Sequence, residues 1–453
     1  MSHHAIVNAR IVRPNGIVFG TILYNEDGKI VSIIEQKARQ VIKEDETERI
    51  IDAKGAYAVP GGVDGHVHFG GFGETLIADD FYQGSLAALA GGTTTVVDFC
   101  EPIFGETASA CIEKRKQEAK IAAVDYAFHF VWTKEYKKQM EELPFIEKEG
   151  ISNFKLFTVY ENTDLTVEEI EEILRSLKKE GKNYSFLIHA EEKQLIESKE
   201  KEYINHEKEM IYLAKSRPAR SEESMVEKLY VLSQQMRSKI CIAHTSAKGS
   251  VLQIHGSNKE HICLETCPHY LAFTQDKLKG RGGEFYTMTP PLRKEEDREA
   301  LWNGILEGDI AMFSTDHCPY HKIDKVGKDW NRVPCGVDGV QVRMIYLFSE
   351  GVVKRKLSMS DYVKLTSENA AKFYGFYPRK GCLKAGSDAD IVLILEEETT
   401  DYGIDTCKGN IDYTIYEKSR FRGKITRVVK SGKTVYDGSN MYATQGMGFY
   451  IPT

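Results

Sequence analysis

The chain alternates eight short apolar runs with charged segments, and this rhythm restricts its fold more than any other feature. The runs occupy residues 61–69, 93–100, 125–132, 151–159, 185–191, 239–246, 261–270 and 310–319. Helix-like segments lie between them, such as residues 79–92, 165–181 and 221–236. The acidic start of the second segment and Gly181 at its end are typical of helix termini. A strand followed by a helix, repeated eight times, predicts a (β/α)₈ TIM-like barrel with its active site at the carboxyl ends of the strands.

The two ends of the chain have a different pattern. Residues 5–59 contain short alternating strands, and Asp27-Gly28 predicts a hairpin turn between two of them. Strand patterns with little helix return near the C-terminus. We therefore expect a discontinuous β-sandwich domain from residues 1–56 and 380–440, a barrel domain from residues 57–379, and a C-terminal tail from residues 441–453.

Composition and charge exclude several classes of protein. The net charge of the 453 residues is -7 and no block of lysine and arginine occurs, which argues against nucleic-acid binding. No apolar stretch is long enough to span a membrane, and the opening residues lack the features of a secretory signal. The nine cysteines include no C-x-x-C pair, which favours reduced thiols over disulfides or a zinc ribbon. A cytoplasmic enzyme is the expectation.

Polar side chains interrupt five of the apolar runs at comparable positions. They are His66 and His68 in the first run, Lys155 in the fourth, His189 in the fifth, His244 in the sixth and Asp316 in the eighth. Alternate residues of a strand face the same way, so His66 and His68 can reach one metal ion together. The conjunction of these residues on different strands of one barrel predicts a metal site.

Each of these residues has a structural explanation when it is taken alone. The paired histidines can be exposed or hydrogen-bonded, and either of the later histidines can be a satisfied core residue. Lys155 can extend its ammonium group to solvent from the barrel rim. Asp316 can form a turn or cap a helix. Only the whole set favours metal binding.

The residue types suit a hydrolase that uses two divalent cations. Neutral imidazoles bind Zn²⁺, Mn²⁺ and similar ions. Two such cations, about 3.5–4 Å apart, need bridging anions to offset their repulsion. Burial can lower the pKa of Lys155, and its neutral amine can then add carbon dioxide and become a carbamate with two bridging oxygens. Asp316 can bind one metal and accept a proton from a bridging water, provided that the two lie within hydrogen-bond reach.

The motifs around these residues resemble those of the cyclic amidohydrolases, most of all the dihydropyrimidinases and hydantoinases of the amidohydrolase superfamily. The resemblance runs through nearly the whole chain, from PGGVDGHVHF through FKLFTVY, HAE, IAHTS, ETCPHYL, MTPPLR and STDHCP to SENAAKFYGFYPRKGCLKAGSDADIVL. It implies two divalent metal ions, with Zn²⁺ the first choice and Mn²⁺ an alternative. It places His66, His68 and Asp316 on one ion, His189 and His244 on the other, and carbamylated Lys155 between them.

The resemblance also implies substrate contacts. Tyr160 directs its hydroxyl at the carbonyl under attack, where a fixed phenol donor stabilises the developing oxyanion. Thr289 and Asp338 occupy positions where the family holds the cyclic imide or ureide through backbone groups, and Phe157 is the fourth expected contact. The glycine-rich loop after His68 is shorter than in many relatives, which leaves the preference for a ring substituent open.

The leading hypothesis is hydrolysis of a cyclic amide to an N-carbamoyl amino acid by a hydroxide held between the metals. Dihydrouracil or a 5-substituted hydantoin would be such a substrate. Allantoinase and dihydroorotase are alternatives, although dihydroorotases usually carry arginine and proline where this chain has Phe69-Gly70-Gly71. A non-catalytic scaffold, like the collapsin response mediator proteins, would lack some of the six proposed ligands. The resemblance further implies a homotetramer or a dimer.

Overall fold

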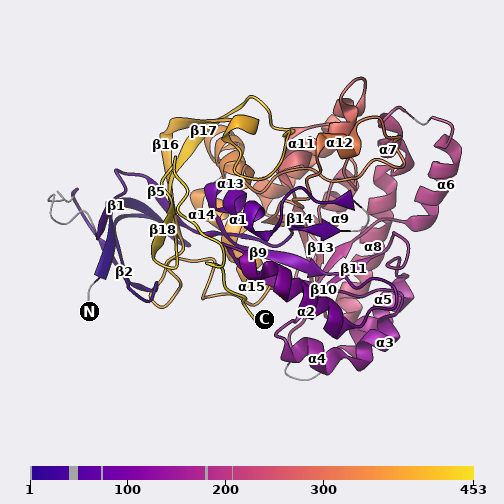
Figure 1. Cartoon of the computed structure of the whole chain (residues 1–453), viewed down its shortest axis with the longest axis horizontal. Coiled ribbons are helices and arrows are strands. Elements are labelled where there is room, and N and C mark those ends of the chain that lie inside the picture. The colour runs from indigo at the N-terminus through magenta and orange to yellow at the C-terminus, as the bar shows by residue number, and fades with distance from the viewer. Residues whose placement is uncertain (1–2, 40–48, 73–74, 179–181, 207) are drawn as a thin grey trace.

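The predicted barrel is present as eight parallel strands that pair in chain order (Figure 1). The computed structural model describes residues 3–39, 49–72, 75–178, 182–206 and 208–453. Each barrel strand lies within one of the eight predicted apolar runs. The strands are β6 (Gly62–Asp64), β9 (Thr93–Cys100), β10 (Asp125–Val131), β11 (Asn153–Phe157), β12 (Ser185–His189), β13 (Lys239–Ile242), β14 (Ile262–Thr266) and β15 (Ile310–Phe313). A short hairpin, β7 (Gly71–Phe72) and β8 (Thr75–Leu76), follows the first strand.

The helices between these strands begin at local sequence signals. Asp80 caps α1 (Phe81–Ala90) through its carboxylate, and Thr166 forms the capping box of α5 (Val167–Ser176). The predicted end of the second helix, Gly181, lies outside the described residues. The other α-helices are α2 (Ala108–Glu118), α3 (Tyr136–Glu141), α4 (Leu143–Lys148), α6 (Lys193–Tyr203), α7 (Ile211–Ser216), α8 (Ala219–Met236), α9 (Lys248–Ile254), α10 (Pro268–Ala272), α11 (Glu295–Glu307), α12 (Lys322–Lys325), α13 (Arg343–Tyr346), α14 (Met359–Val363) and α15 (Asn369–Phe373). The 3₁₀ helices are η2 (Ala119–Ile121), η3 (Gln275–Leu278), η4 (Gly283–Tyr286) and η7 (Ile404–Thr406), and the π-helices are η5 (Leu347–Lys354) and η6 (Lys364–Glu368).

The barrel strands are apolar on both faces because both faces are buried. Along β9, Val96 shares a core cluster with Leu89 of α1, whereas Val97 belongs to a separate cluster with Leu187 of β12 and Met312 of β15. Successive side chains of a strand point to opposite faces, so the first cluster fills the space under the helices and the second fills the barrel. This double burial explains why the runs in the sequence are continuous instead of alternating.

One buried arginine joins the first strand of the barrel to the last. The Nη1 group of Arg343 donates to the backbone oxygens of Val63 on β6, at 3.2 Å, and of Phe313 on β15, at 2.7 Å. Its Nε lies 3.7 Å from the carboxylate of Asp64. Asp64 in turn accepts a hydrogen bond from the backbone of His66 at 3.3 Å. The seam of the barrel therefore also positions the first histidine of the predicted site.

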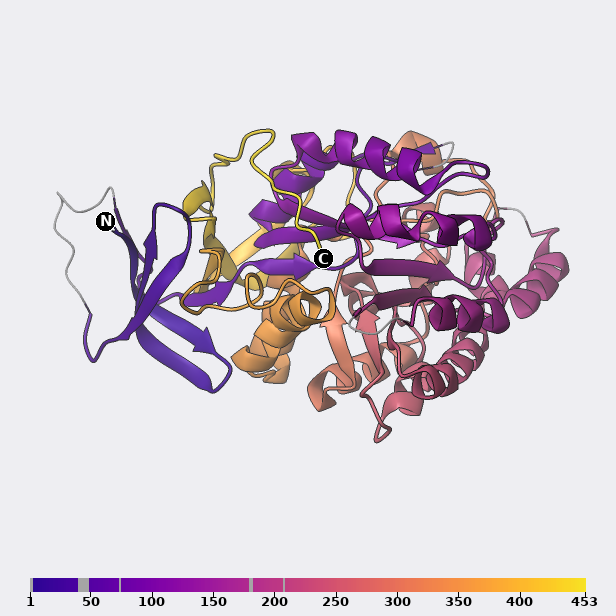
Figure 2. The same cartoon turned by 90° about the horizontal axis from the view of Figure 1, so that it is seen from below.

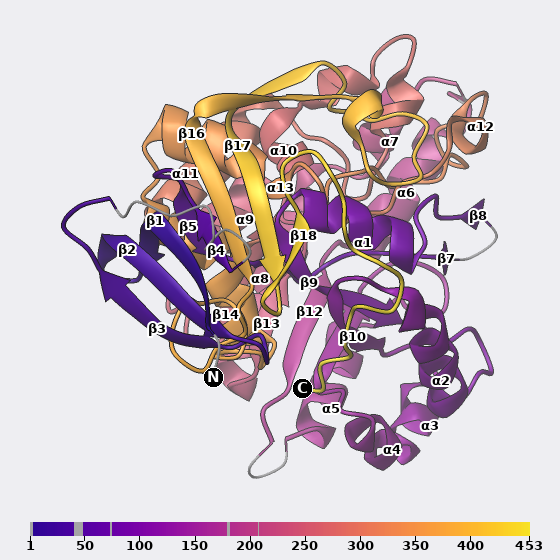
Figure 3. The same cartoon turned by 60° about the vertical axis from the view of Figure 1, so that its left-hand side comes forward.

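The N- and C-terminal strands form one mixed sheet, as their shared pattern predicted (Figure 3). Its order is β18-β17-β16-β5-β1-β2-β3, with β4 beside β1. Apolar side chains of β1, β2, β16 and β17 share one core cluster, so the sheet curls around a core of its own. The predicted turn joins β2 to β3, and Gly28 adopts a φ of 70° there. The strands are β1 (His3–Arg13), β2 (Gly16–Asn25), β3 (Ile30–Glu35), β4 (Ile50–Asp52), β5 (Tyr57–Pro60), β16 (Ile391–Tyr402), β17 (Ser419–Lys430) and β18 (Lys433–Tyr436).

The C-terminal tail lies against the amino-terminal end of β10, so the last residues of the chain contact the barrel (Figure 2). The backbone of Ile451 donates to Tyr126 at 2.7 Å, and its side chain joins the cluster inside the barrel. At the first residue of β10, the carboxylate of Asp125 lies 2.5 Å from Nζ of Lys380 and 2.7 Å from Nζ of Lys430. These buried ion pairs tie the barrel to the C-terminal part of the chain.

Two further expectations concern the state of the cysteines and the presence of membrane-spanning helices. All nine cysteines carry free thiols, as the spacing predicted. Among the described helices, none combines the length and the apolar character that crossing a membrane requires.

Candidate metal centre

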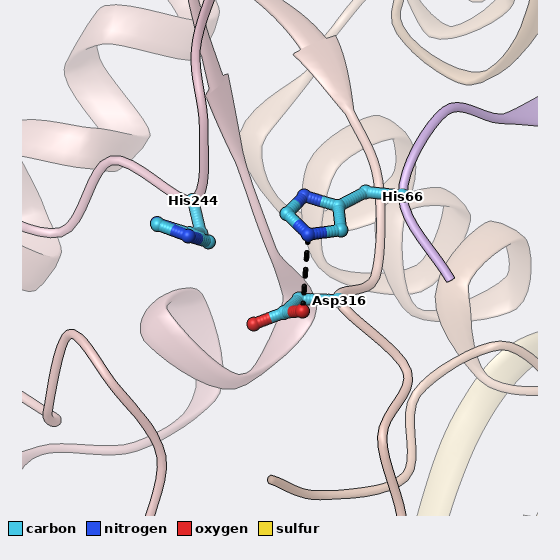
Figure 4. A group of neighbouring side chains, drawn as sticks. All are labelled: His66, His244 and Asp316. Atoms are coloured by element: carbon cyan, nitrogen blue, oxygen red, sulfur yellow. Dashed lines mark ion pairs between the residues drawn. The ribbon is translucent and has the colours of Figure 1, made fainter. Parts of the chain in front are cut away.

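Three predicted ligands converge at the carboxyl ends of the barrel strands (Figure 4). His66 follows β6, His244 follows β13 and Asp316 follows β15, and one ligand atom of each lies within 4.8 Å of the other two. Nε2 of His66 lies 3.2 Å from Oδ1 of Asp316, and Nε2 of His68 lies 3.1 Å from the same oxygen. The two alternate histidines thus face one point, beside one carboxylate.

The backbone at two of these residues adopts a costly conformation. The φ angle is 36° at His244 and 48° at Asp316, in the left-handed region that non-glycine residues avoid. The neighbouring Thr315 helps to hold this geometry, since its backbone N–H and its hydroxyl donate to Asp64 at 3.1 and 2.7 Å. Such strain persists where the surrounding structure enforces it, and it is typical of functional sites.

His189 and His244 form a second pair of candidate metal ligands. His189 ends β12, and its Nδ1 lies 3.1 Å from Nε2 of His244. Burial lowers the pKa of His66, His189 and His244 below the ordinary value of 6.5. The rings are therefore neutral near pH 7, and each keeps a lone pair for a cation. The two facing nitrogens of the second pair fit neighbouring positions on one ion.

Lys155 places a buried amine beside the histidines. It lies on β11 and is 0% exposed, and its Nζ has no hydrogen-bond partner among the described residues. Its nearest described neighbours include the rings of Phe99 and Phe157, whose centroids lie 5.4 and 4.9 Å from Nζ. Burial lowers the pKa of Lys155 to about 8. An ammonium group is costly in such a place, which favours the neutral amine or a chemically modified one.

Two carboxylates that the sequence analysis did not single out orient the histidines. Oε1 of Glu265, on β14, lies 3.0 Å from Nδ1 of His66. Oε2 of Glu191 lies 2.7 Å from Nε2 of His189. A carboxylate on one ring nitrogen fixes which nitrogen is left for a metal. Their only signal in the sequence is an acidic residue inside an apolar run.

Arg217 links this supporting layer to the predicted substrate-binding tyrosine. Its guanidinium forms an ion pair with Glu191, and its Cζ lies 5.2 Å from the ring centroid of Tyr160. Although burial raises the pKa of Glu191, Arg217 and His189 lower it further, to about 2. Glu191 is therefore ionised and can hold the His189 ring. No local pattern in the sequence marks Arg217 for this role, because two helices, α6 and α7, separate it from Glu191 in the chain.

Three of the four predicted substrate contacts lie together. The ring centroids of Phe157 and Tyr160 lie 5.8 and 5.2 Å from that of His189. The Tyr160 hydroxyl donates to Oγ1 of Thr289 at 2.7 Å. Tyr160 has a φ of 73°, so the chain turns sharply there and places the phenol beside the histidine. These residues can line one side of a substrate site.

Asp338, the fourth predicted contact, directs its carboxylate elsewhere. Oδ2 accepts a hydrogen bond from the hydroxyl of Thr414 at 2.6 Å, and Oδ1 accepts one from the backbone of Ile415 at 3.2 Å. Its side chain is therefore engaged within the protein. A substrate contact at this position would use the backbone, which matches the main-chain role implied by the resemblance.

The donor set fits divalent cations. Four imidazoles and Asp316 surround a region bordered by the partnerless amine of Lys155, and nitrogen and oxygen donors of this kind suit Zn²⁺ and Mn²⁺. If Lys155 becomes a carbamate, the one group of the set that repels cations becomes a ligand.

Comparisons with known proteins agree with this architecture. A model of the amidohydrolase family matches residues 57–435. A D-phenylhydantoinase of Escherichia coli O1:K1 / APEC is 31% identical over 462 residues, which cover 98% of each chain. A crystal structure of a D-hydantoinase superposes with a TM-score of 0.92 at 30% identity, over 100% of this chain and 99% of that one. The dihydropyrimidinase from Brevibacillus agri NCHU1002 gives a TM-score of 0.91 at 29% identity, over 100% and 98% of the two chains.

Proposed function

This chain belongs to the amidohydrolase family, in its hydantoinase and dihydropyrimidinase branch, and we propose that it hydrolyses a cyclic amide or ureide to an N-carbamoyl amino acid. A dihydropyrimidine or a 5-substituted hydantoin is the proposed substrate. The observation that carries the proposal is the convergence of four imidazoles, Asp316 and the buried amine of Lys155 at the mouth of one barrel.

The proposed ligands divide into two groups. His66, His68 and Asp316 would hold one divalent ion, and His189 and His244 the other, with Zn²⁺ the first choice and Mn²⁺ the alternative. When bound, such ions polarise a carbonyl and lower the pKa of water. The separate pairings of His68 with Asp316 and of His189 with His244 support this division.

Lys155 is proposed to act as a carbamate. The nitrogen of its neutral amine attacks carbon dioxide, so that an N–C bond forms and one proton is released. The side chain then ends in a carboxylate. The lowered pKa of Lys155 supports this step, because a free amine is needed as the nucleophile. The product is an anion that can lie between two cations.

Two side chains are proposed to serve the reaction directly. Asp316 accepts the proton of the attacking water and passes it to the ring nitrogen as the amide bond breaks. His66 and His68 hold its pKa below the ordinary value despite burial, so the carboxyl is ionised before the reaction. Tyr160 donates its hydroxyl to the carbonyl oxygen as negative charge develops there, and Thr289 holds the phenol in position until a substrate binds.

A substrate panel tests the proposal. The metal-loaded protein is assayed with dihydrouracil, hydantoin, 5-alkyl and 5-aryl hydantoins, allantoin and dihydroorotate, by loss of ultraviolet absorbance and by detection of the ring-opened acid. We expect turnover of dihydrouracil or of hydantoins. Turnover of allantoin or dihydroorotate alone would move the protein to another branch of the family. A metal-free protein that is inert towards every ring would favour a scaffold. The domain boundaries, the cytoplasmic location and the homotetramer or dimer stay predictions.

A further inference from the structure

Glu101 is the first residue after β9, and the strand directs its side chain at the barrel mouth. Two residues earlier, the ring of Phe99 stacks on that of His68, with centroids 4.6 Å apart. Between them, Cys100 faces the opposite way, towards Cys111 of helix α2. Because successive side chains of a strand alternate, Glu101 returns to the side of Phe99 and His68.

The electrostatic surroundings of Glu101 agree with this direction. Burial raises the pKa of its carboxyl, and the two groups that oppose this effect, His68 and Lys155, both belong to the candidate metal centre. The residue is nevertheless only half-buried, so a small molecule in the mouth can reach it. The carboxylate thus borders the same space as the proposed reaction.

Glu101 differs from the other carboxylates of this region in its hydrogen bonding. Glu265 and Glu191 are bound to histidines, and Asp338 is bound to Thr414. Within the described part of the chain, no hydrogen bond or ion pair to the Glu101 carboxylate is present. A partly desolvated carboxylate without a donor gains free energy when a cation binds it.

We propose that Glu101 selects the substrate by binding a positively charged group on the ring substituent, so that the preferred cyclic amide carries an alkylammonium or guanidinium side chain. This inference rests on the proposed function and names the substrate class within it. Glu101 follows β9 and Tyr160 follows β11, so the single strand β10 separates them. Two strand spacings amount to about 10 Å. A small ring with a short alkyl chain spans that length, with its carbonyl at Tyr160 and its charge at Glu101.

The test compares two rings that differ in charge but match in length. The metal-loaded protein is assayed with 5-(4-aminobutyl)hydantoin and 5-pentylhydantoin. We expect kcat/KM to favour the cationic ring by about tenfold, the effect of one partly buried charge pair. In Glu101→Gln the two rings should become equal within about twofold. In Glu101→Lys the cationic ring should become the poorer substrate.

A matched control removes the same charge elsewhere. Glu113 is exposed on helix α2, and Glu113→Gln changes the net charge of the protein as Glu101→Gln does. The control should keep the preference for the cationic ring. Loss of the preference in both variants would assign it to the overall charge and overturn the proposal.

A binding measurement separates this inference from the proposed function. N-carbamoyl-lysine and N-carbamoyl-2-aminoheptanoic acid, the ring-opened forms of the two rings, are titrated into each protein by calorimetry, which requires no turnover. Tighter binding of the lysine derivative by about tenfold, lost in Glu101→Gln, supports the role of Glu101 even if no ring is hydrolysed. Equal binding of both acids overturns the inference, and hydrolysis of neutral rings alone overturns it while the proposed function stands.

Discussion

Oε1 of Glu265 lies 3.0 Å from Nδ1 of His66, and this contact leaves Nε2 of the same ring facing Asp316. Ser314 donates its hydroxyl to the other oxygen of Glu265 at 2.8 Å, so the carboxylate is itself held in place. Burial raises the pKa of Glu265 to about 7. The orientation of the first histidine therefore depends on a residue of the seventh strand.

The variant Glu265→Gln tests this support. The amide keeps the shape of the side chain but loses its charge, so the His66 ring is held less firmly and is a weaker donor. We expect metal affinity to fall about 10- to 100-fold. Competition with a chelator measures this affinity, and circular dichroism checks that the fold is retained. Unchanged metal affinity would show that Glu265 serves packing only, and Glu113→Gln supplies the control for charge.

Removal of Lys155 tests the proposed bridge. In Lys155→Ala no carbamate can form, so the protein should lose metal and activity together. Short carboxylic acids, such as acetate or propionate, should restore part of both, because they can occupy the space of the missing group. Elemental analysis measures metal content, and ¹³C NMR with labelled bicarbonate detects the carbamate carbon in the unaltered protein. Full activity of the variant without added acid would remove Lys155 from the mechanism.

The phenol of Tyr160 is expected to act in the transition state. Tyr160→Phe removes one donor from the carbonyl oxygen, and loss of one such donor costs about 10²- to 10³-fold in kcat. KM should change little, because the hydroxyl binds the oxyanion more strongly than it binds the carbonyl. Steady-state kinetics on the best ring of the panel separate these effects. Tyr442→Phe removes an exposed phenol that is bonded to Asp437 and should leave both constants unchanged. A rise in KM at constant kcat would assign Tyr160 to substrate binding.

The ion pairs at the amino end of the barrel predict how stability depends on acid. Lys380 lies 2.9 Å from Asp388 and 2.7 Å from Asp390. Burial raises the pKa of Asp388, but Lys380 and Lys29 lower it further, from 3.8 to about 2. The Asp388 carboxyl thus binds a proton less tightly in the folded state than in the unfolded state. The stabilisation is complete above pH 4 and is lost as the pH falls towards 2.

Urea unfolding between pH 6 and pH 2.5 measures this loss. Lys380→Met removes the cation shared by three carboxylates and leaves Asp390 with no ion pair among the described residues, so it should lower the free energy of unfolding by about 3–5 kcal/mol at pH 6. The variant should also depend less on pH in the acid range. Equal acid sensitivity of the two proteins would show that other carboxyls govern the transition.

The strand rhythm of the sequence was sufficient to predict the barrel, because continuous burial of both faces leaves a local signature in each run. The polar residues that interrupt these runs marked the barrel mouth, and a different pattern of short alternating strands identified the mixed sheet of the two chain ends. These features depend on periodicity and on short-range turns such as the one at Gly28, and neighbouring residues determine both.

Which polar and charged groups bind each other was decided only by the closed barrel. Glu265 meets His66 across 199 positions of the chain, and Arg343 joins β6 to β15 across the seam. The carboxylate of Asp338, whose backbone was expected at the substrate, accepts a hydrogen bond from Thr414, 76 positions along the chain. A charged side chain binds whichever donor the packing brings to it, and that choice depends on distances between segments that no local pattern encodes. That no described residue binds the Glu101 carboxylate is likewise a result of the tertiary structure.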